Sequence, residues 1–245
     1  LGSNTTASNN TAIGKQSLGA NTTGAQNTAV GSLTLDANTT GQYNTAVGRA
    51  ALSANVGASY NTAVGRNALM ESTTGSTNTA VGYAAGEKVT TAANTVAVGS
   101  YAAYLLTTGS GNTAIGNSTL GATGSTAVTG SNNTAVGNSA LLAITTGAYN
   151  VAVGALALDA NTTGGNNTGL GYGSLGANTT GVSNVGLGYE ALAANTTANS
   201  NTAVGRSALT ANTTGDQNVA VGRAALDANT TGGYNVAVGT NALDA

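Results

Sequence analysis

A short motif returns along the chain at a nearly fixed spacing. Each copy ends in Gly and is preceded by Asn, by Thr or Val, by Ala or Gly, and by an aliphatic residue. Twelve of the thirteen intervals between these glycines are 17 residues. A unit of this size cannot bury a core alone, so the spacing predicts units that stack on one another. The fourteen glycines are Gly14, Gly31, Gly48, Gly65, Gly82, Gly99, Gly116, Gly137, Gly154, Gly171, Gly188, Gly205, Gly222 and Gly239.

The repeat reads N-T-A-V-G-x-x-A-L-x-A-N-T-T-G-x-x, and we number its positions 1 to 17 from the first Asn. Thr, Asn, Gly and Val dominate, and no helical period of apolar residues outlasts the glycines. Gly at position 5 and the NTTG segment predict turns after short strands. We therefore expect an all-β parallel solenoid, a β-roll of about fourteen 17-residue coils, in which residues 1–245 form a single repeat array. The longer interval from Gly116 to Gly137 indicates a four-residue insertion within residues 119–132.

Apolar residues occupy fixed positions of the repeat. Position 4 is always aliphatic and position 2 is usually Thr or Val, and alternation along a strand places both on one face. We expect that face and the Leu of position 9 to form the core. Position 3 is always Ala or Gly, which predicts a close contact with another chain or sheet on the opposite face. The candidate core residues are Val30, Val47, Val64, Leu52, Leu69 and Leu209.

Asn occupies position 1 in every repeat except the one that begins at Thr95. Stacked amides can form hydrogen bonds along the direction of stacking, as in other repetitive β-structures. We therefore interpret this column as a structural ladder rather than as a ligand site. Its representative residues are Asn27, Asn44, Asn61, Asn201, Asn218 and Asn235.

The composition excludes most catalytic chemistry. The chain has no His and no Cys, so imidazole or thiolate metal ligands and His-based acid–base catalysis are absent. Its Asp and Glu residues do not form a pair suited to glycoside hydrolysis. We expect no enzyme activity, no cofactor and no metal. A net charge of -2 without a basic stripe argues against nucleic acid, and the lack of a long apolar run argues against membrane insertion of this segment.

Two familiar motifs have simpler explanations. Residues 171–176 match G-x-G-x-x-G, but neither the expected helix nor the distant acidic residue accompanies them, so we attribute the match to additional glycines in one repeat. The NTT segments are formal glycosylation sequons. Asn and Thr also bind neighbouring backbone groups in turns, which is the reading we favour.

Seven tyrosines lie directly before the Asn of position 1 or directly after the Gly of position 5. Aromatic rings at turns can stack on sugar rings, or they can pack within or between chains. We favour packing and keep glycan contact as the alternative. The candidate glycan contacts are Tyr43, Tyr60, Tyr83, Tyr172 and Tyr189.

The N-T-A-[VI]-G core with its Ala-Leu partner resembles the head repeats of trimeric autotransporter adhesins of the YadA type. It is also similar to repeat regions of phage tail fibres. This resemblance covers nearly the whole chain and implies a left-handed parallel β-roll in which three chains form one fibre. The 17-residue unit is longer than the adhesin head repeat, and its N-T-T-G half fits the tail-fibre repeats better.

One Val or Ile, one Leu and a Thr or Val supply only about 4–7 kcal/mol of apolar transfer per coil. Burial against another chain would add to this, so we expect a homotrimer or another homo-oligomer. The leading functional hypothesis is a non-enzymatic, extracellular structural or adhesive fibre, on a virion or a bacterial cell surface, that projects a receptor-binding tip toward a host glycan or receptor. The alternatives are a self-assembling filament subunit and an ice-binding solenoid with Thr arrays.

Overall fold

The computed structural model describes residues 2–121 and 126–244. The chain forms two compact units, Leu1–Thr129 and Gly130–Ala245, which we call the N-terminal and C-terminal units. Their boundary falls within residues 119–132, where the sequence predicts the insertion, and residues 122–125 of that stretch lie outside the described residues. The described residues contain no helix that is long and apolar enough to cross a membrane.

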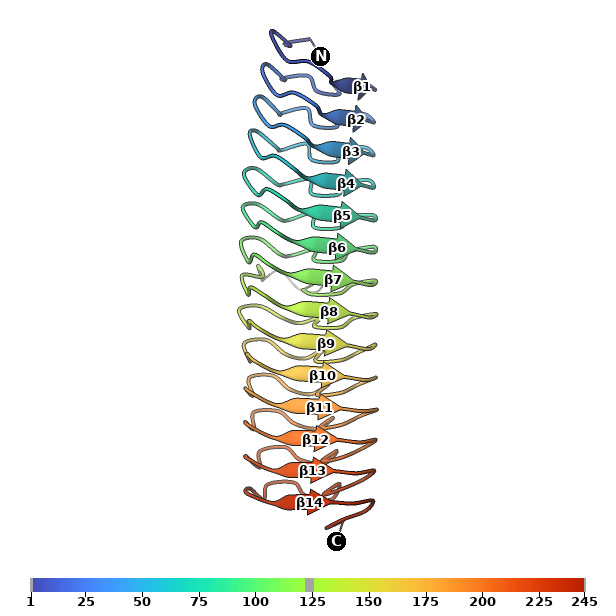
Figure 1. Cartoon of the computed structure of the whole chain (residues 1–245), viewed down its shortest axis with the longest axis vertical. Coiled ribbons are helices and arrows are strands. Elements are labelled where there is room, and N and C mark those ends of the chain that lie inside the picture. The colour runs from blue at the N-terminus through green and yellow to red at the C-terminus, as the bar shows by residue number, and fades with distance from the viewer. Residues whose placement is uncertain (1, 122–125, 245) are drawn as a thin grey trace. The chain divides into compact units, whose positions relative to one another are not determined.

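The N-terminal unit is a parallel β-solenoid (Figure 1). Each coil contributes one three-residue strand, and consecutive strands pair in parallel with partners 17 residues apart, as in Ala12 with Ala29. The predicted fold class is confirmed in this unit. Its described strands are β1 (Thr11–Ile13), β2 (Thr28–Val30), β3 (Thr45–Val47), β4 (Thr62–Val64), β5 (Thr79–Val81), β6 (Val96–Val98) and β7 (Thr113–Ile115).

The C-terminal unit repeats this architecture (Figure 1). Consecutive strands again pair in parallel at a separation of 17 residues, as in Ala203 with Ala220. We number coils by the strand that each contains. The described strands of this unit are β8 (Thr134–Val136), β9 (Val151–Val153), β10 (Thr168–Leu170), β11 (Val185–Leu187), β12 (Thr202–Val204), β13 (Val219–Val221) and β14 (Val236–Val238).

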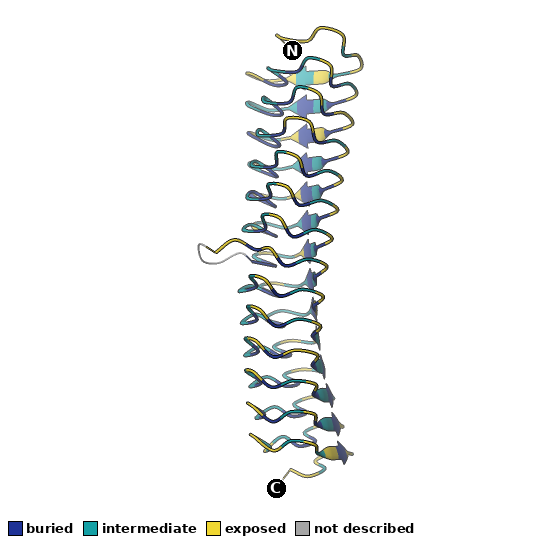
Figure 2. Ribbon diagram, turned by 90° about the vertical axis from the view of Figure 1, so that its left-hand side faces the viewer, coloured by how far each residue is buried: buried dark blue, intermediate teal, exposed yellow. Residues whose placement is uncertain are grey.

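The strands face the opposite way from the sequence-based expectation. The middle residue of each strand after β1 is buried, whereas the residues before and after it are half-buried or exposed (Figure 2). Val30, Val47 and Val64 therefore lie on the outward face of their strands, and Val47 is 36% exposed. Assigning these valines to the core of the single chain was wrong.

The narrowness of the coil explains this orientation. The inward side chain of position 3 meets the interior of the coils, and a Cβ added to Gly169 would already lie 3.1 Å from the Ser174 backbone oxygen and 3.4 Å from Leu158 Cγ. Only Ala or Gly fits there, while the larger Val fits outside. The close contact predicted for position 3 is therefore made inside the chain, and it is not available to a neighbouring chain or sheet.

Leu at position 9 fills the interior opposite the strands. Leu52, Leu69 and Leu209 are at most 1% exposed. Their φ angles of about +50° lie in the left-handed region, which non-glycine residues adopt at a cost of roughly 1–2 kcal/mol each. The backbone accepts this conformation in most coils because it turns a large apolar side chain into the coil.

Gly at position 5 ends every strand for two reasons. At Gly171 φ is +131°, which L side chains rarely adopt. In addition, an added Cβ would lie 2.5 Å from the carbonyl oxygen of Gly188 in the next coil. Both the backbone conformation and the approach of the next coil therefore require glycine.

Coils 5 and 6 lack the Leu of position 9 and compensate at position 12. Position 9 is Gly86 in coil 5 and Ala103 in coil 6, and position 12 becomes Val89 and Leu106, all fully buried. A Cβ on Gly86 would lie 3.4 Å from Val89 Cγ2, so the side chain of Val89 reaches the space next to position 9. The apolar volume has moved within the coil rather than disappeared.

Candidate functional site

The outward residues of the strands form a continuous row of apolar side chains and threonines in each unit, which we call the strand face. Positions 2 and 4 carry Thr, Val, Ile or Leu and no charged residue in the described strands. Ile115 is 40% exposed, Leu170 41% and Leu187 39%. Because the parallel ladder uses the strand backbone groups, only side chains remain on this face to contact a partner. The strand face is therefore an apolar surface with scattered hydroxyls.

The Asn column of position 1 forms a ladder between coils. The backbone N–H of Asn44 donates to Asn27 Oδ1 at 2.9 Å, and that of Asn218 donates to Asn201 Oδ1 at 2.8 Å. The side-chain Nδ2 donates to the backbone carbonyl of position 15 in the same repeat, as in Asn27 to Gly41 at 2.8 Å. The described ladder is built mainly on backbone donors, whereas the sequence suggested amide-to-amide bonds. The other representative residues, Asn61, Asn201 and Asn235, accept or donate in the same way.

A second ladder at position 12 was missed by the sequence analysis. Here the amides bond each other directly: Asn178 Nδ2 donates to Asn161 Oδ1 at 3.0 Å, and Asn195 Nδ2 donates to Asn178 Oδ1 at 2.9 Å. The signal was present as the repeated Asn of N-T-T-G. The same ladder runs through Asn21, Asn38 and Asn55 in the N-terminal unit.

Burial of this column removes the glycosylation alternative for most sequons. Asn21, Asn38, Asn161, Asn178, Asn195 and Asn212 are 0% exposed. An amide that is enclosed and bonded to its neighbours cannot carry a glycan in the folded state. The NTT segments therefore serve the packing of the coils.

The structure brings four of the five candidate tyrosines together in two pairs. Tyr43 and Tyr60 stack with ring centroids 4.9 Å apart and an interplanar angle of 3°. Tyr172 and Tyr189 stack at 5.4 Å and 14°. Tyr83 lies apart from both pairs, edge-on to Tyr101 at 5.2 Å. These rings are 40% to 60% exposed, so intramolecular stacking leaves much of their surface open.

Position 6, beside the strand face, carries the chain's basic residues except Lys88. Lys15, Arg49, Arg66, Arg206 and Arg223 are exposed there. Arg66 lies over the ring of Tyr83 at 5.6 Å, and Arg206 lies over the ring of Tyr189 at 5.7 Å. Such cation–π pairs at exposed sites contribute about 0.5–1 kcal/mol each.

Coils 4 and 5 carry a local group of charges. Lys88 Nζ forms a salt bridge with Glu71, which raises the pKa of Lys88, and lies 3.9 Å from Glu87 Oε1. Asn67 Nδ2 donates to Glu87 Oε2 at 3.2 Å. A cavity of about 230 Å³ opens beside Glu71 and Lys88. One ammonium faces two carboxylates, so this group keeps a net negative charge, and we describe it as a local surface network.

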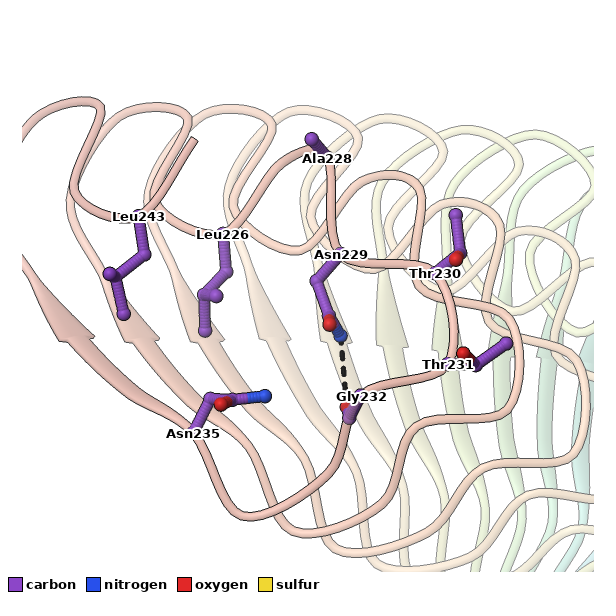
Figure 3. A pocket seen from close by; sticks show the side chains of 8 residues that line it. All are labelled: Leu226, Ala228, Asn229, Thr230, Thr231, Gly232, Asn235 and Leu243. Carbon is purple, nitrogen blue, oxygen red and sulfur yellow. Dashed lines mark hydrogen bonds between the residues drawn. The ribbon is translucent and has the colours of Figure 1, made fainter. Parts of the chain in front are cut away.

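A cavity of about 380 Å³ lies in the last coils of the C-terminal unit (Figure 3). Its walls are the interior columns of the solenoid: Leu226 and Leu243 from position 9, Asn229 from position 12 and Asn235 from position 1. Asn229 donates to the Gly232 carbonyl oxygen at 3.0 Å, as its counterparts do elsewhere. In the preceding coils the next coil covers the residues at these positions. The cavity is therefore lined by the same residues that pack one coil against the next.

The acidic side chains of the described residues form no group of three or more that could hold a metal ion. Burial raises the pKa of Asp36 and of Asp159, but each is a separate carboxylate at position 10. Residues 171–176 form a strand-to-turn connection within coil 10, without the helix that a dinucleotide site requires.

The site candidates are therefore the strand face and the position 6 edge. A scan of the chain against protein-family models and a search of curated proteins each found no match.

Proposed function

We propose that this chain is a non-enzymatic structural segment of an extracellular fibre, on a virion or a bacterial surface, that self-associates and carries a receptor-binding tip. The observation that carries the proposal is the strand face, which is apolar, uncharged and open in the single chain. Contiguous exposed apolar surfaces are typical of protein interfaces. The resemblance to adhesin heads and tail fibres favours a left-handed coil and a homotrimer.

Self-association would take place through positions 2 and 4 rather than position 3. The Ala side chains of position 3 are enclosed within the coils, while Val81 and Ile115 are 37% and 40% exposed. Covering these side chains in a trimer would add apolar burial at about 25 cal/mol per Å². This supplies the extra stabilisation that the small interior of one coil lacks.

Light scattering tests the proposal. The purified chain is expected to have the mass of a trimer. The variant Val204→Lys/Val221→Lys places two charges on the strand face and is expected to be a monomer with unchanged circular dichroism. Thr180→Lys/Thr214→Lys adds the same charges at exposed position 14 and should remain a trimer. A monomeric parent chain would overturn the proposal.

The ice-binding alternative is less well supported. The hydroxyl of Thr22 donates to the Thr39 carbonyl oxygen at 3.0 Å, and that of Thr179 donates to the Thr196 carbonyl at 3.1 Å. Position 13 thus uses its hydroxyls between coils and leaves position 14 as the open Thr rank of the NTTG segment. Thermal hysteresis in the purified protein would favour the alternative.

A further inference from the structure

The position 6 edge of the C-terminal unit contains a run of four large side chains in consecutive coils. Tyr172, Tyr189, Arg206 and Arg223 follow one another at 17-residue steps, which corresponds to a rise of about 4.8 Å each. Tyr172 stacks on Tyr189, and Arg206 lies over the other side of Tyr189. We call these residues the Tyr–Arg run.

The two guanidinium groups of this run lack an acidic partner. Among the described residues, Lys88 is the only basic side chain within 4.0 Å of a carboxylate. Arg223 Nη2 makes one long hydrogen bond of 3.5 Å to Asn241 Oδ1. Two like charges in adjacent coils repel each other, and an anion held between them would relieve that repulsion. Guanidinium forks match the geometry of carboxylate and sulfate-type oxyanions.

The other end of the run offers an open aromatic face. The position 6 residue in the coil before Tyr172 is Ala155, whose side chain ends at Cβ. Tyr172 stacks on Tyr189 on the other side, and no aromatic ring of the column covers it on the Ala155 side, a place that we call the notch. The neighbouring Glu190 carboxylate raises the pKa of the Tyr189 phenol.

We propose that the Tyr–Arg run binds an anionic oligosaccharide. A sugar ring enters the notch at Ala155 and stacks on Tyr172, while an acidic substituent of a later sugar pairs with Arg206 and Arg223. Ala155 and Arg206 are three coils apart, about 14 Å, so the ligand spans several sugar units. Such a site would bind along the side of a coil, separate from any tip, and it does not depend on self-association.

The N-terminal unit supplies a natural control. There the position 6 column reads Arg49, Arg66, Tyr83 in consecutive coils, with the same pair of guanidiniums. Tyr101 packs edge-on to Tyr83 at 5.2 Å, at the side where the column continues. This run therefore has the charges but lacks the open aromatic face.

Titration calorimetry of the full chain tests the proposal with three tetrasaccharides: a sulfated heparin fragment, tetragalacturonate and neutral maltotetraose. We expect binding of at least one anionic probe and none of maltotetraose. The two anionic probes distinguish sulfate from carboxylate recognition. Raising the salt concentration should weaken binding, because exposed charge pairs are screened.

Variants of the chain distinguish binding at the Tyr–Arg run from nonspecific attraction of an anion to any pair of arginines. Arg206→Gln/Arg223→Gln should weaken binding about tenfold or more, whereas Arg49→Gln/Arg66→Gln, with the same loss of charge, should bind as the parent does. Ala155→Leu covers the notch without changing charge and without adding an aromatic face, and should also weaken binding. Equal losses in the two Arg variants, full binding by Ala155→Leu, or equal binding of maltotetraose would each overturn the proposal. Light scattering of the same samples reports self-association independently.

Discussion

Position 12 lies inside the solenoid in both coils 10 to 13 and coils 5 to 6, but different residue types fill it in the two regions. In coils 10 to 13, position 12 is Asn, and each amide bonds the amide of the coil before it, as Asn195 does with Asn178 at 2.9 Å. In coils 5 and 6 the same position is Val89 and Leu106, which are fully buried without polar partners. One column is satisfied by hydrogen bonds and the other by apolar contact.

Position 12 changes from Asn to other residues between coils 3 and 4. At this change, the hydrogen bonding of one coil depends on the residue in the next coil. Asn55 is the last amide before the change, and its Oδ1 has no hydrogen-bond partner. Ser72 in the next coil is fully buried, and its Oγ also has none. A buried polar atom without a partner costs about 1–3 kcal/mol. The Asn run therefore ends in unpaired groups at this change of type, whereas Asn161, the first amide after Ile144, accepts from Asn178 and donates to Gly164.

The largest effect is expected from a residue that both kinds of coil share. Gly171→Ala should destabilise the C-terminal unit by more than about 3 kcal/mol, because φ is +131° and the added Cβ meets the Gly188 carbonyl. Gly176→Ala in the same coil is the matched control: its φ is not positive and its nearest contact would be 3.2 Å. Thermal unfolding should show a large loss for the first variant and a small change for the second. Equal effects would contradict this account.

Exchanging Asn and Leu at position 12 between the two regions should destabilise both of them. Leu106→Asn isolates an amide between Val89 and Val128, and Asn178→Leu removes one member of the ladder. We expect each to cost about 2–4 kcal/mol through unsatisfied buried groups. The midpoint of denaturant unfolding measures this loss.

Asn178→Ser provides the control for the ladder, since it removes the amide and leaves a small polar group, as at Ser72. It should cost less than Asn178→Leu. If Leu106→Asn were neutral, position 12 would tolerate an isolated amide.

A double-mutant cycle tests the compensation between positions 9 and 12 in coil 5. Gly86→Leu alone should overpack the coil by about 1–3 kcal/mol. Val89→Ala alone should leave a cavity that costs about 1–2.5 kcal/mol. The double variant again places a large apolar residue at position 9 and a smaller residue at position 12. Gly86 already has the positive φ of the other position 9 residues. We expect the double variant to be more stable than the sum predicts, and an additive result would argue against compensation.

The smallest expected effect is a gain. Ser72→Ala removes a buried hydroxyl without a partner and should raise stability by about 1 kcal/mol. Ser174→Ala is the contrasting variant, because Ser174 Oγ donates to the Gly186 carbonyl at 2.7 Å, and it should lower stability by a similar amount. Thermal unfolding of both variants checks the signs, and the same sign for both would contradict the assignment.

Much of the fold follows from the sequence alone. The 17-residue period fixed where each strand and turn occurs, because Gly at position 5 is the residue that accepts both the φ near +130° and the contact with the next coil. The Leu of position 9 was identified as an interior residue for a similar reason, since a large apolar side chain repeats there. The sequence also indicated that Asn at position 1 links the coils.

Only the tertiary structure decided which side of each strand faces inward. Alternation allows two orientations, and hydrophobicity alone favours turning Val47 inward and Ala46 outward. The narrow coil reverses that choice, because Ala46 fits inside, where it is 0% exposed, and a valine would not. The amide ladder of position 12 and the notch at Ala155 likewise depend on residues 17 apart in the chain meeting across coils, a proximity created by stacking.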